Sequence, residues 1–167
     1  MQKILLTKKN NKGFSLVEVV MAIGVLSIGL LAVSQLFSKN IKEMMEIRDQ
    51  TTAISLAQEG VELVRNYHDN HPPVFDPGTF RVDINPFGNV NLGSGSYTLH
   101  YSTSTGLGIF GHTGSSATKF QRKIIINGTS SPKTVTSLVS WNGADPGATI
   151  NCNTANKCVY ATMQLFD

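Results

Sequence analysis

Residues 12–37 read KGFSLVEVVMAIGVLSIGLLAVSQLF, and this stretch decides the fold. From Phe14 to Phe37 the chain contains one charged residue, Glu18, and no proline. About 20 apolar residues, rising ~1.5 Å each in a helix, cross the hydrocarbon core of a bilayer. The glycines and serines fit such a helix, because small residues let neighbouring membrane helices approach closely. The stretch therefore predicts a membrane-spanning helix.

The helix should continue beyond the apolar run. Between Ser38 and His68 there is no proline, and charged residues alternate with apolar ones. It should end before Pro72 and Pro73, because proline lacks an N–H and its ring clashes with the preceding turn. The pattern predicts one helix of about 50 residues, roughly 80 Å long, apolar in its first half and amphipathic in its second. Four apolar residues at helical spacing should pack on the rest of the protein: Ile54, Ala57, Val61 and Val64.

The remainder of the chain is predicted to be β-structure. After Pro73 the composition shifts to Gly, Ser, Thr and Asn, and apolar residues alternate with polar ones, which is typical of half-buried strands. Asn127-Gly128 and Asn142-Gly143 are turn signals, and 88–95 and 103–118 read as loops. We expect an α+β fold, with the long helix packed on an antiparallel sheet. The alternating sets are Phe80, Val82 and Ile84; Tyr97, Leu99 and Tyr101; Phe120, Ile124 and Ile126; Val135, Val139 and Trp141; and Val159, Ala161, Met163 and Leu165.

The formal net charge of +3 comes largely from the start of the chain. Four lysines precede Phe14, so the rest has 10 Lys+Arg (14 − 4) against 11 Asp+Glu. A near-neutral remainder does not support a nucleic-acid partner. Basic residues that are mixed into the expected strands should form a solvated face: Lys119, Arg122, Lys123 and Lys133.

Two cysteines, Cys152 and Cys158, lie close together near the C-terminus. An even count in a chain that leaves the cytoplasm suggests one disulfide closing a short loop. Two reduced thiols are the alternative. A zinc site is less favoured, because residues 153–157 add no His or Cys to complete four ligands.

The segment Lys12-Gly13-Phe14-Ser15-Leu16-Val17-Glu18 stands directly before the apolar run. This order resembles the prepilin cleavage motif of type IV pilins and type II secretion pseudopilins, with a basic leader, a glycine before the cut, phenylalanine after it and glutamate fifth in the mature chain. The resemblance implies that a prepilin peptidase cuts between Gly13 and Phe14 and methylates the new amine. It also implies a single pass through the inner (cytoplasmic) membrane with the head outside. Assembly with other pilins or pseudopilins into an extracellular filament would follow.

Glu18 is expected to act in assembly. A carboxylate within a membrane helix costs roughly 2.5–3.5 kcal/mol on insertion scales, so it normally has a partner. Cleavage would create one, the α-ammonium of Phe14, one helical turn earlier. The resemblance implies that Glu18 pairs with the Phe amine of a neighbouring subunit. The alternatives are a pair within one helix, since residues four apart share a face, and a Glu18 that reaches interfacial water.

The resemblance divides the chain into a basic leader (1–13), a transmembrane and filament-core helix (14–38), the amphipathic half of the same helix (39–70) and a β-rich head (71–167). Gln35 stands where many major pilins have a proline, which favours a minor pilin. The expected strands at 120–126 and 135–141 resemble the sheet of minor pilins and of the I-type pseudopilin. The Cys152–Cys158 pair resembles the disulfide-bounded C-terminal loop of major pilins.

Two other classes of function stay open. Ala32-Val33-Ser34 looks like a small-x-small signal-peptidase site, which would make the chain a conventionally secreted binding protein. The other class is an uncut, anchored enzyme. The four histidines are scattered, and no G-x-x-x-x-G-K loop or Ser/His/Asp spacing is recognisable. We therefore expect no catalytic residue, cofactor or metal. The orientation rests mostly on the resemblance, because Lys39, Lys42 and Arg48 follow the apolar run and leave the positive-inside bias slight.

Overall fold

A computed structural model describes residues 13–71, 76–84, 90–102, 109–112, 114, 116–147, 152 and 156–166. The chain forms two compact units, Met1–Met44 and Met45–Asp167, called here the N-terminal and C-terminal units. Several residues used in the sequence analysis lie outside the described residues: Lys3, Lys8, Lys9, Lys12, Pro72 and Pro73.

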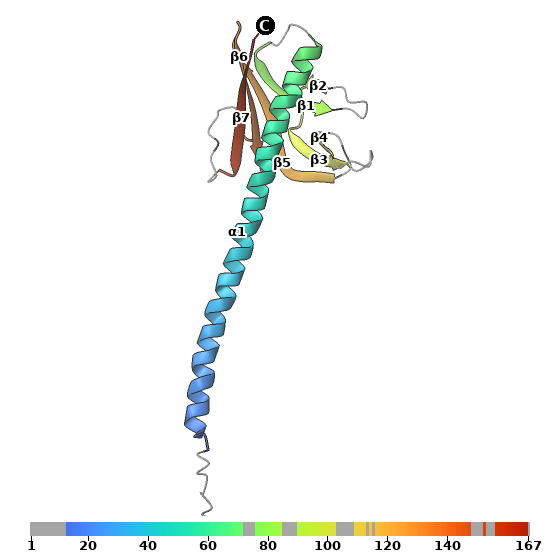
Figure 1. Ribbon diagram of the computed structural model, residues 1–167. Coiled ribbons are helices and arrows are strands. Elements are labelled where there is room, and N and C mark those ends of the chain that lie inside the picture. The colour runs from blue at the N-terminus through green and yellow to red at the C-terminus, as the bar shows by residue number, and fades with distance from the viewer. Residues whose placement is uncertain are drawn as a thin grey trace, which may run out of the picture. The chain divides into compact units, whose positions relative to one another are not determined.

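One helix, α1 (Leu16–Asn70, 55 residues), belongs to both units (Figure 1). Its hydroxyl side chains bond back to carbonyls one turn earlier, as the Ser27 hydroxyl does to the Ile23 carbonyl at 2.7 Å, so they leave no unsatisfied group on an apolar surface. At its C-terminal end the His71 N–H donates to the Tyr67 carbonyl at 3.0 Å. The predicted continuous helix is confirmed.

In the described part of the C-terminal unit, seven strands form one sheet, and all their pairings are antiparallel. The central strand, β5, pairs along one edge with β6, which in turn pairs with β7. The other edge of β5 is shared, because β1 pairs with residues 124–126 and β3 pairs with residues 116–121. The strands are β1 (Gly78–Ile84), β2 (Val90–Gly93), β3 (Thr98–Ser102), β4 (Ile109–Gly111), β5 (Ser116–Asn127), β6 (Lys133–Ser140) and β7 (Cys158–Leu165).

The five longest strands coincide with the predicted alternating sets, and the α+β architecture is confirmed. The loops expected at 88–95 and 103–118 are wrong in part, because they contain β2, β4 and the start of β5. Strands of four and three residues are too short to show alternation. They form because neighbouring strands supply backbone partners, as Val82 does for Leu92 and Tyr101 does for Phe110.

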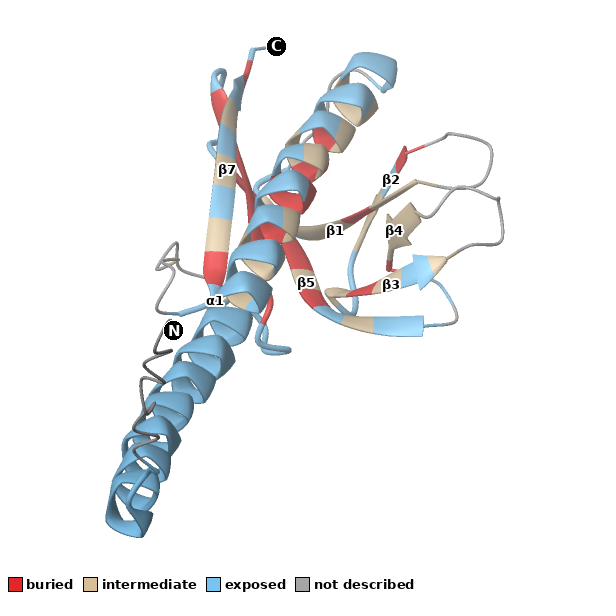
Figure 2. Cartoon of the chain, turned by 60° about the horizontal axis from the view of Figure 1, so that its bottom comes forward, coloured by how far each residue is buried: buried red, intermediate tan, exposed pale blue. Residues whose placement is uncertain are grey.

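The second half of α1 lies across one face of the sheet, with β6 and β7 on one side and β1–β4 on the other (Figure 1). Figure 2 shows its buried residues gathered on that half. Ala57 and Val64 are buried as expected and Val61 is half-buried, but Ile54 is 41% exposed, so the expectation for Ile54 is wrong. The contact face combines small residues, which allow a close approach of helix and sheet, with Leu56 and Val64. The buried helix residues are Ala53, Leu56, Ala57, Gly60 and Val64.

Two apolar clusters join this helix face to the sheet. Each cluster includes residues of β5, and Arg122 lies between the two sets along that strand. Arg122 stands between Phe120 and Ile124 on the helix-facing side of the strand and is fully buried. One cluster comprises Val64, Val82, Val90, Ile124, Ile126, Val135 and Leu165. The other comprises Ala53, Leu56, Ala57, Leu99, Phe120, Val139 and Trp141.

The solvated basic face expected on β5 and β6 is wrong. Lys123 and Lys133 are 5% and 7% exposed and Arg122 is 0% exposed, and Lys119 is the exception at the surface. The Lys123 ammonium binds the Asp145 carboxylate and lies over the Tyr97 ring. The segment after β6 therefore folds back to the outer face of the sheet, where it contacts Lys123 and Ser140.

Arg122 connects α1 to two strands. Its guanidinium donates to the Glu59 carboxylate at 3.1 Å and to the Val82 carbonyl at 3.1 Å, with a longer bond of 3.4 Å to the Leu56 carbonyl. A buried guanidinium is tolerated only when acceptors surround it, because desolvation of the charge is costly. The chain supplies these acceptors from α1 and β1, so burial of Arg122 fixes the helix on the sheet.

A second buried polar contact lies next to Arg122. The His112 ring nitrogens lie 3.0 Å from Asp83 Oδ1 and 3.2 Å from the Arg122 carbonyl oxygen. Burial raises the pKa of Asp83, but hydrogen bonds from the His112 ring and backbone N–H outweigh it, so the pKa lies below 3.8. The contact therefore stabilises the fold above that pH, and this contribution is lost as the pH falls through the lowered pKa.

Gly60 is the point of closest approach between α1 and the sheet. A Cβ at this position would lie 3.0 Å from Arg122 Cδ and 3.2 Å from Ser137 Cβ, and closer still to the Ser137 hydroxyl. Gly60→Ala should therefore force α1 away from β5 and β6 and cost about 1–3 kcal/mol of stability, although alanine favours helix. Thermal unfolding of the full chain in detergent, followed by circular dichroism, measures the change.

Gly29→Ala is the matched control, because a Cβ there meets nothing within 4 Å. This substitution should leave the unfolding temperature unchanged or slightly raised. Equal unfolding temperatures for the Gly60 and Gly29 variants would contradict the close-packing role of Gly60.

Candidate functional site

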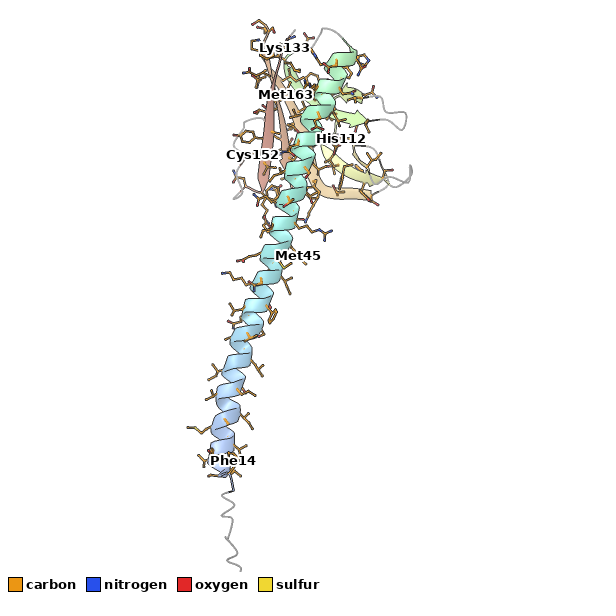
Figure 3. The ribbon with its side chains drawn as sticks, viewed as in Figure 1. Phe14, Met45, His112, Lys133, Cys152 and Met163 are labelled. Carbon is orange, nitrogen blue, oxygen red and sulfur yellow. A yellow bond between two sulfur atoms is a disulfide. The ribbon has the colours of Figure 1, made fainter. Side chains whose placement is uncertain are left out.

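Gly13 and Phe14 precede the first turn of α1, in non-helical backbone. The helix begins with the Val19 N–H donating to the Ser15 carbonyl at 3.2 Å. No described heavy atom would lie within 4 Å of a Cβ on Gly13, and Phe14 is 82% exposed. The bond between these residues is thus open to an external protease, and Figure 3 shows Phe14 at this end of the helix.

Glu18 lies in the first turn of α1 and is exposed. It shares a shallow groove on the helix surface with Phe14, Val19, Ala22, Ile23 and Leu26. Among the described residues, no cation forms an ion pair with Glu18. In the described part of the chain, the helix therefore presents this carboxylate on an apolar face, one turn from residue 14.

No described residue of the N-terminal unit covers the apolar run. Its large apolar side chains from Phe14 to Phe37 are between 45% and 82% exposed. α1 is long and apolar enough to cross a membrane, and none of its most apolar stretch is buried. A continuous apolar surface of this length requires lipid or other protein chains around it.

Acidic residues of α1 bind basic or polar partners on the sheet at two further places in the C-terminal unit. Glu46 accepts hydrogen bonds from the Trp141 indole at 2.9 Å and the Lys157 ammonium at 3.0 Å. Asp49 pairs with Lys119. Together with the Glu59–Arg122 pair, these contacts fix the register of the helix on the sheet.

The partners of Glu46 and Glu59 were not predicted, because each glutamate is far from its partner in the chain. One signal was present: Arg122 interrupts an otherwise apolar strand face, and a charge at such a position needs a buried partner. The acidic residues in the amphipathic half of the helix supply that partner. The sequence could have suggested an acid–base contact, but not which glutamate makes it.

The structure joins Cys152 and Cys158 by a disulfide, and Figure 3 shows Cys152 beside β7. Next to the bridge, the Trp141 N–H donates to the Lys157 carbonyl at 3.0 Å, so the two ends of the β6–β7 connection meet. Glu46 binds side chains from both ends. The predicted sites thus fall in two places: Gly13, Phe14 and Glu18 come together at the start of α1, and the cysteines belong to the head.

Residues 8–34 match the family model of the prokaryotic N-terminal methylation motif. The motif is that of prepilin-type cleavage and methylation, and the predicted resemblance is confirmed. It is consistent with a type IV pilin or pseudopilin, and the long helix packed on an antiparallel sheet is a pilin-like α+β fold. No curated protein and no solved structure matches the chain significantly.

Glu46 provides a test of how the helix is held on the head. Hydrogen bonds from Trp141, and then from Lys157, hold the pKa of Glu46 below its usual 4.5. A lowered pKa means that the Glu46 carboxylate stabilises the fold fully above its usual pKa of 4.5. This contribution is lost as the pH falls through the lowered pKa. Glu46→Gln should lower the unfolding temperature at pH 7, and the difference from the unaltered chain should shrink below pH 4.5.

Unfolding temperatures of the full chain in detergent between pH 7 and pH 3 measure this effect. Glu43→Gln is the matched control, since Glu43 forms only an exposed pair with Lys39 at 3.8 Å. A Glu46→Gln deficit that is the same at both pH values would show that packing, and not the carboxylate, is responsible.

Proposed function

We propose that the chain is a structural subunit, most consistent with a minor pilin, of a type IV pilus-like filament. The observation that carries the proposal is the uncovered apolar surface of α1, which begins at the cleavage site of the prepilin-type motif. The function is structural and not catalytic, and it needs no cofactor. A type II secretion pseudopilin is the second candidate, because an uninterrupted helix through Gln35 and the same motif suit both.

Processing is the first step. The motif implies prepilin peptidase as the enzyme. Gly13 has no side chain and lies in non-helical backbone, so the Gly13–Phe14 bond can enter the active site of a membrane peptidase. The cut separates residues 1–13 from the apolar helix. The mature chain keeps that helix and stays in the inner membrane with its head outside the cytoplasm.

Assembly is the second step. Cleavage converts the Phe14 peptide nitrogen into an α-ammonium, which remains a cation after methylation. When the helix enters a filament, Glu18 becomes buried among apolar side chains, where burial disfavours its charged form and a neighbouring cation restores it. Pairing with the Phe14 amine of an adjacent subunit would satisfy both groups and set the position of each new subunit.

The rest of the apolar run then exchanges lipid contacts for helix contacts. In a lipid-like environment, close packing stabilises the association of helices, and the hydrophobic effect does not. The glycines of α1 permit such close packing. In this arrangement the β-rich heads form the filament surface. The described basic residues of β5 are buried or paired with carboxylates, so this strand offers no cationic surface for nucleic acid.

The N-terminus and intact mass of the protein recovered from host membranes test the processing step. We expect a chain that starts at Phe14 and carries one added methyl group. A chain that starts after Ser34 would instead indicate a conventionally secreted protein, because the apolar run would have been removed. An uncut chain would contradict processing altogether.

Glu18→Ala tests the assembly step. The variant should be cut as efficiently as the unaltered chain. Its amount in filaments should fall about tenfold or more, because the substitution leaves a buried ammonium without a partner. Immunoblots of membrane and sheared filament fractions measure both quantities. Glu43→Ala, in the exposed part of the same helix, is the control that should assemble normally, and normal filament content for Glu18→Ala would overturn the pairing role.

A further inference from the structure

Two lysines follow the apolar run of α1 on one side of the helix. Lys39 and Lys42 are three residues apart, so their side chains are neighbours on the helix surface. The Lys39 side chain is 74% exposed, and its contact with Glu43 is 3.8 Å long between two exposed side chains. An exposed pair of this kind contributes little, so both ammonium groups remain available to a stronger anion.

These lysines lie at the depth of lipid headgroups when the helix is in a membrane. The run from Phe14 to Phe37 rises about 36 Å at ~1.5 Å per residue, compared with a hydrocarbon core about 30 Å thick. Headgroups extend the bilayer to about 40–45 Å. Lys39 and Lys42 follow Phe37 by two and five residues, about 3 and 8 Å along the helix axis, so their flexible side chains can reach the phosphate layer.

The surroundings of the two lysines suit a phosphate bearing a hydroxylated headgroup. Ser34, Gln35, Ser38, Lys39 and Lys42 line a shallow groove of about 330 Å³. The serine hydroxyls donate to helix carbonyls, Ser34 to Leu31 at 2.9 Å and Ser38 to Ser34 at 3.0 Å. Their oxygens are therefore left as acceptors, whereas the ammonium groups and the Gln35 amide are donors.

We propose that this groove, the Lys39–Lys42 groove, binds the headgroup of an anionic phospholipid in the outer leaflet of the inner membrane. The phosphate accepts hydrogen bonds from the two ammonium groups, and a headgroup hydroxyl donates to a serine oxygen. A zwitterionic lipid fits less well, because its own cation would meet two lysines. The inference rests on the proposed function, since it requires α1 to span the membrane before assembly.

The groove gives a reason for positive charge on the outer side of the span. Cations there work against the positive-inside bias, and the sequence alone leaves them unexplained. A bound headgroup would hold α1 at a fixed depth, with the Gly13–Phe14 bond at the opposite interface where the peptidase acts. Extraction into a filament then requires the headgroup to be released.

Native mass spectrometry of the full chain in detergent, titrated with phosphatidylglycerol or phosphatidylcholine, tests the proposal. The chain should bind phosphatidylglycerol about 25-fold or more tightly than phosphatidylcholine, which is the free-energy sum of two lysine increments. Lys39→Gln and Lys42→Gln should each weaken phosphatidylglycerol binding about fivefold, and together about 25-fold, because each lysine near an anionic surface contributes a similar increment. Phosphatidylcholine binding should not change in these variants.

Arg65→Gln is the matched control, because it removes an exposed cation from the same helix about 35 Å further along. It should bind both lipids as the unaltered chain does. Equal affinity for the two lipids, or an equal loss in Arg65→Gln, would overturn the proposal. Carbonate extraction of vesicles holding the mature chain separates the failures: a chain that washes off contradicts the membrane stage of the proposed function, whereas a retained chain without lipid preference contradicts the groove alone.

Discussion

The buried guanidinium of Arg122 joins the elements of the C-terminal unit. Its side chain binds Glu59 and the Leu56 carbonyl on α1 and the Val82 carbonyl on β1. Its backbone N–H donates to the Tyr97 carbonyl, and its carbonyl faces the His112 ring, which also binds Asp83. A charge in this position has to keep its acceptors, because the cost of an unpaired buried cation is several kcal/mol. The helix, β1 and the β3–β4 region are therefore fixed around one residue, through its side chain and its backbone.

This polar centre explains why α1 comes closest to the sheet at a glycine. Arg122 occupies space between two apolar clusters, so α1 comes close only where its side chain is missing, at Gly60. Ala53 and Ala57 continue the narrow face, and Ile54 turns toward solvent. The exposed isoleucine is then available to another chain, as is the apolar run in the N-terminal unit.

The two halves of α1 meet different requirements with one continuous helix. The second half carries acidic residues that bind the sheet, and these contacts make it part of a folded unit. The first half has almost no charge, and its only carboxylate lies one turn from the cleavage site. In the proposed assembly the first half would exchange lipid for other subunits, while the second half stays packed on the sheet.

The sequence by itself determined the features that depend on local composition. These are the apolar run, the motif around Gly13, the absence of proline up to His71 and the alternation in the five longest strands. Each lies within one continuous stretch of chain, so it can be read directly from the order of the residues. Only the tertiary structure decided which glutamate meets Arg122, that Lys123 is buried beneath the segment after β6, and that Val90 to Gly93 and Ile109 to Gly111 become strands. These outcomes depend on partners that are distant in the chain, and a short polar segment or a lone basic residue carries no record of the surface that will cover it.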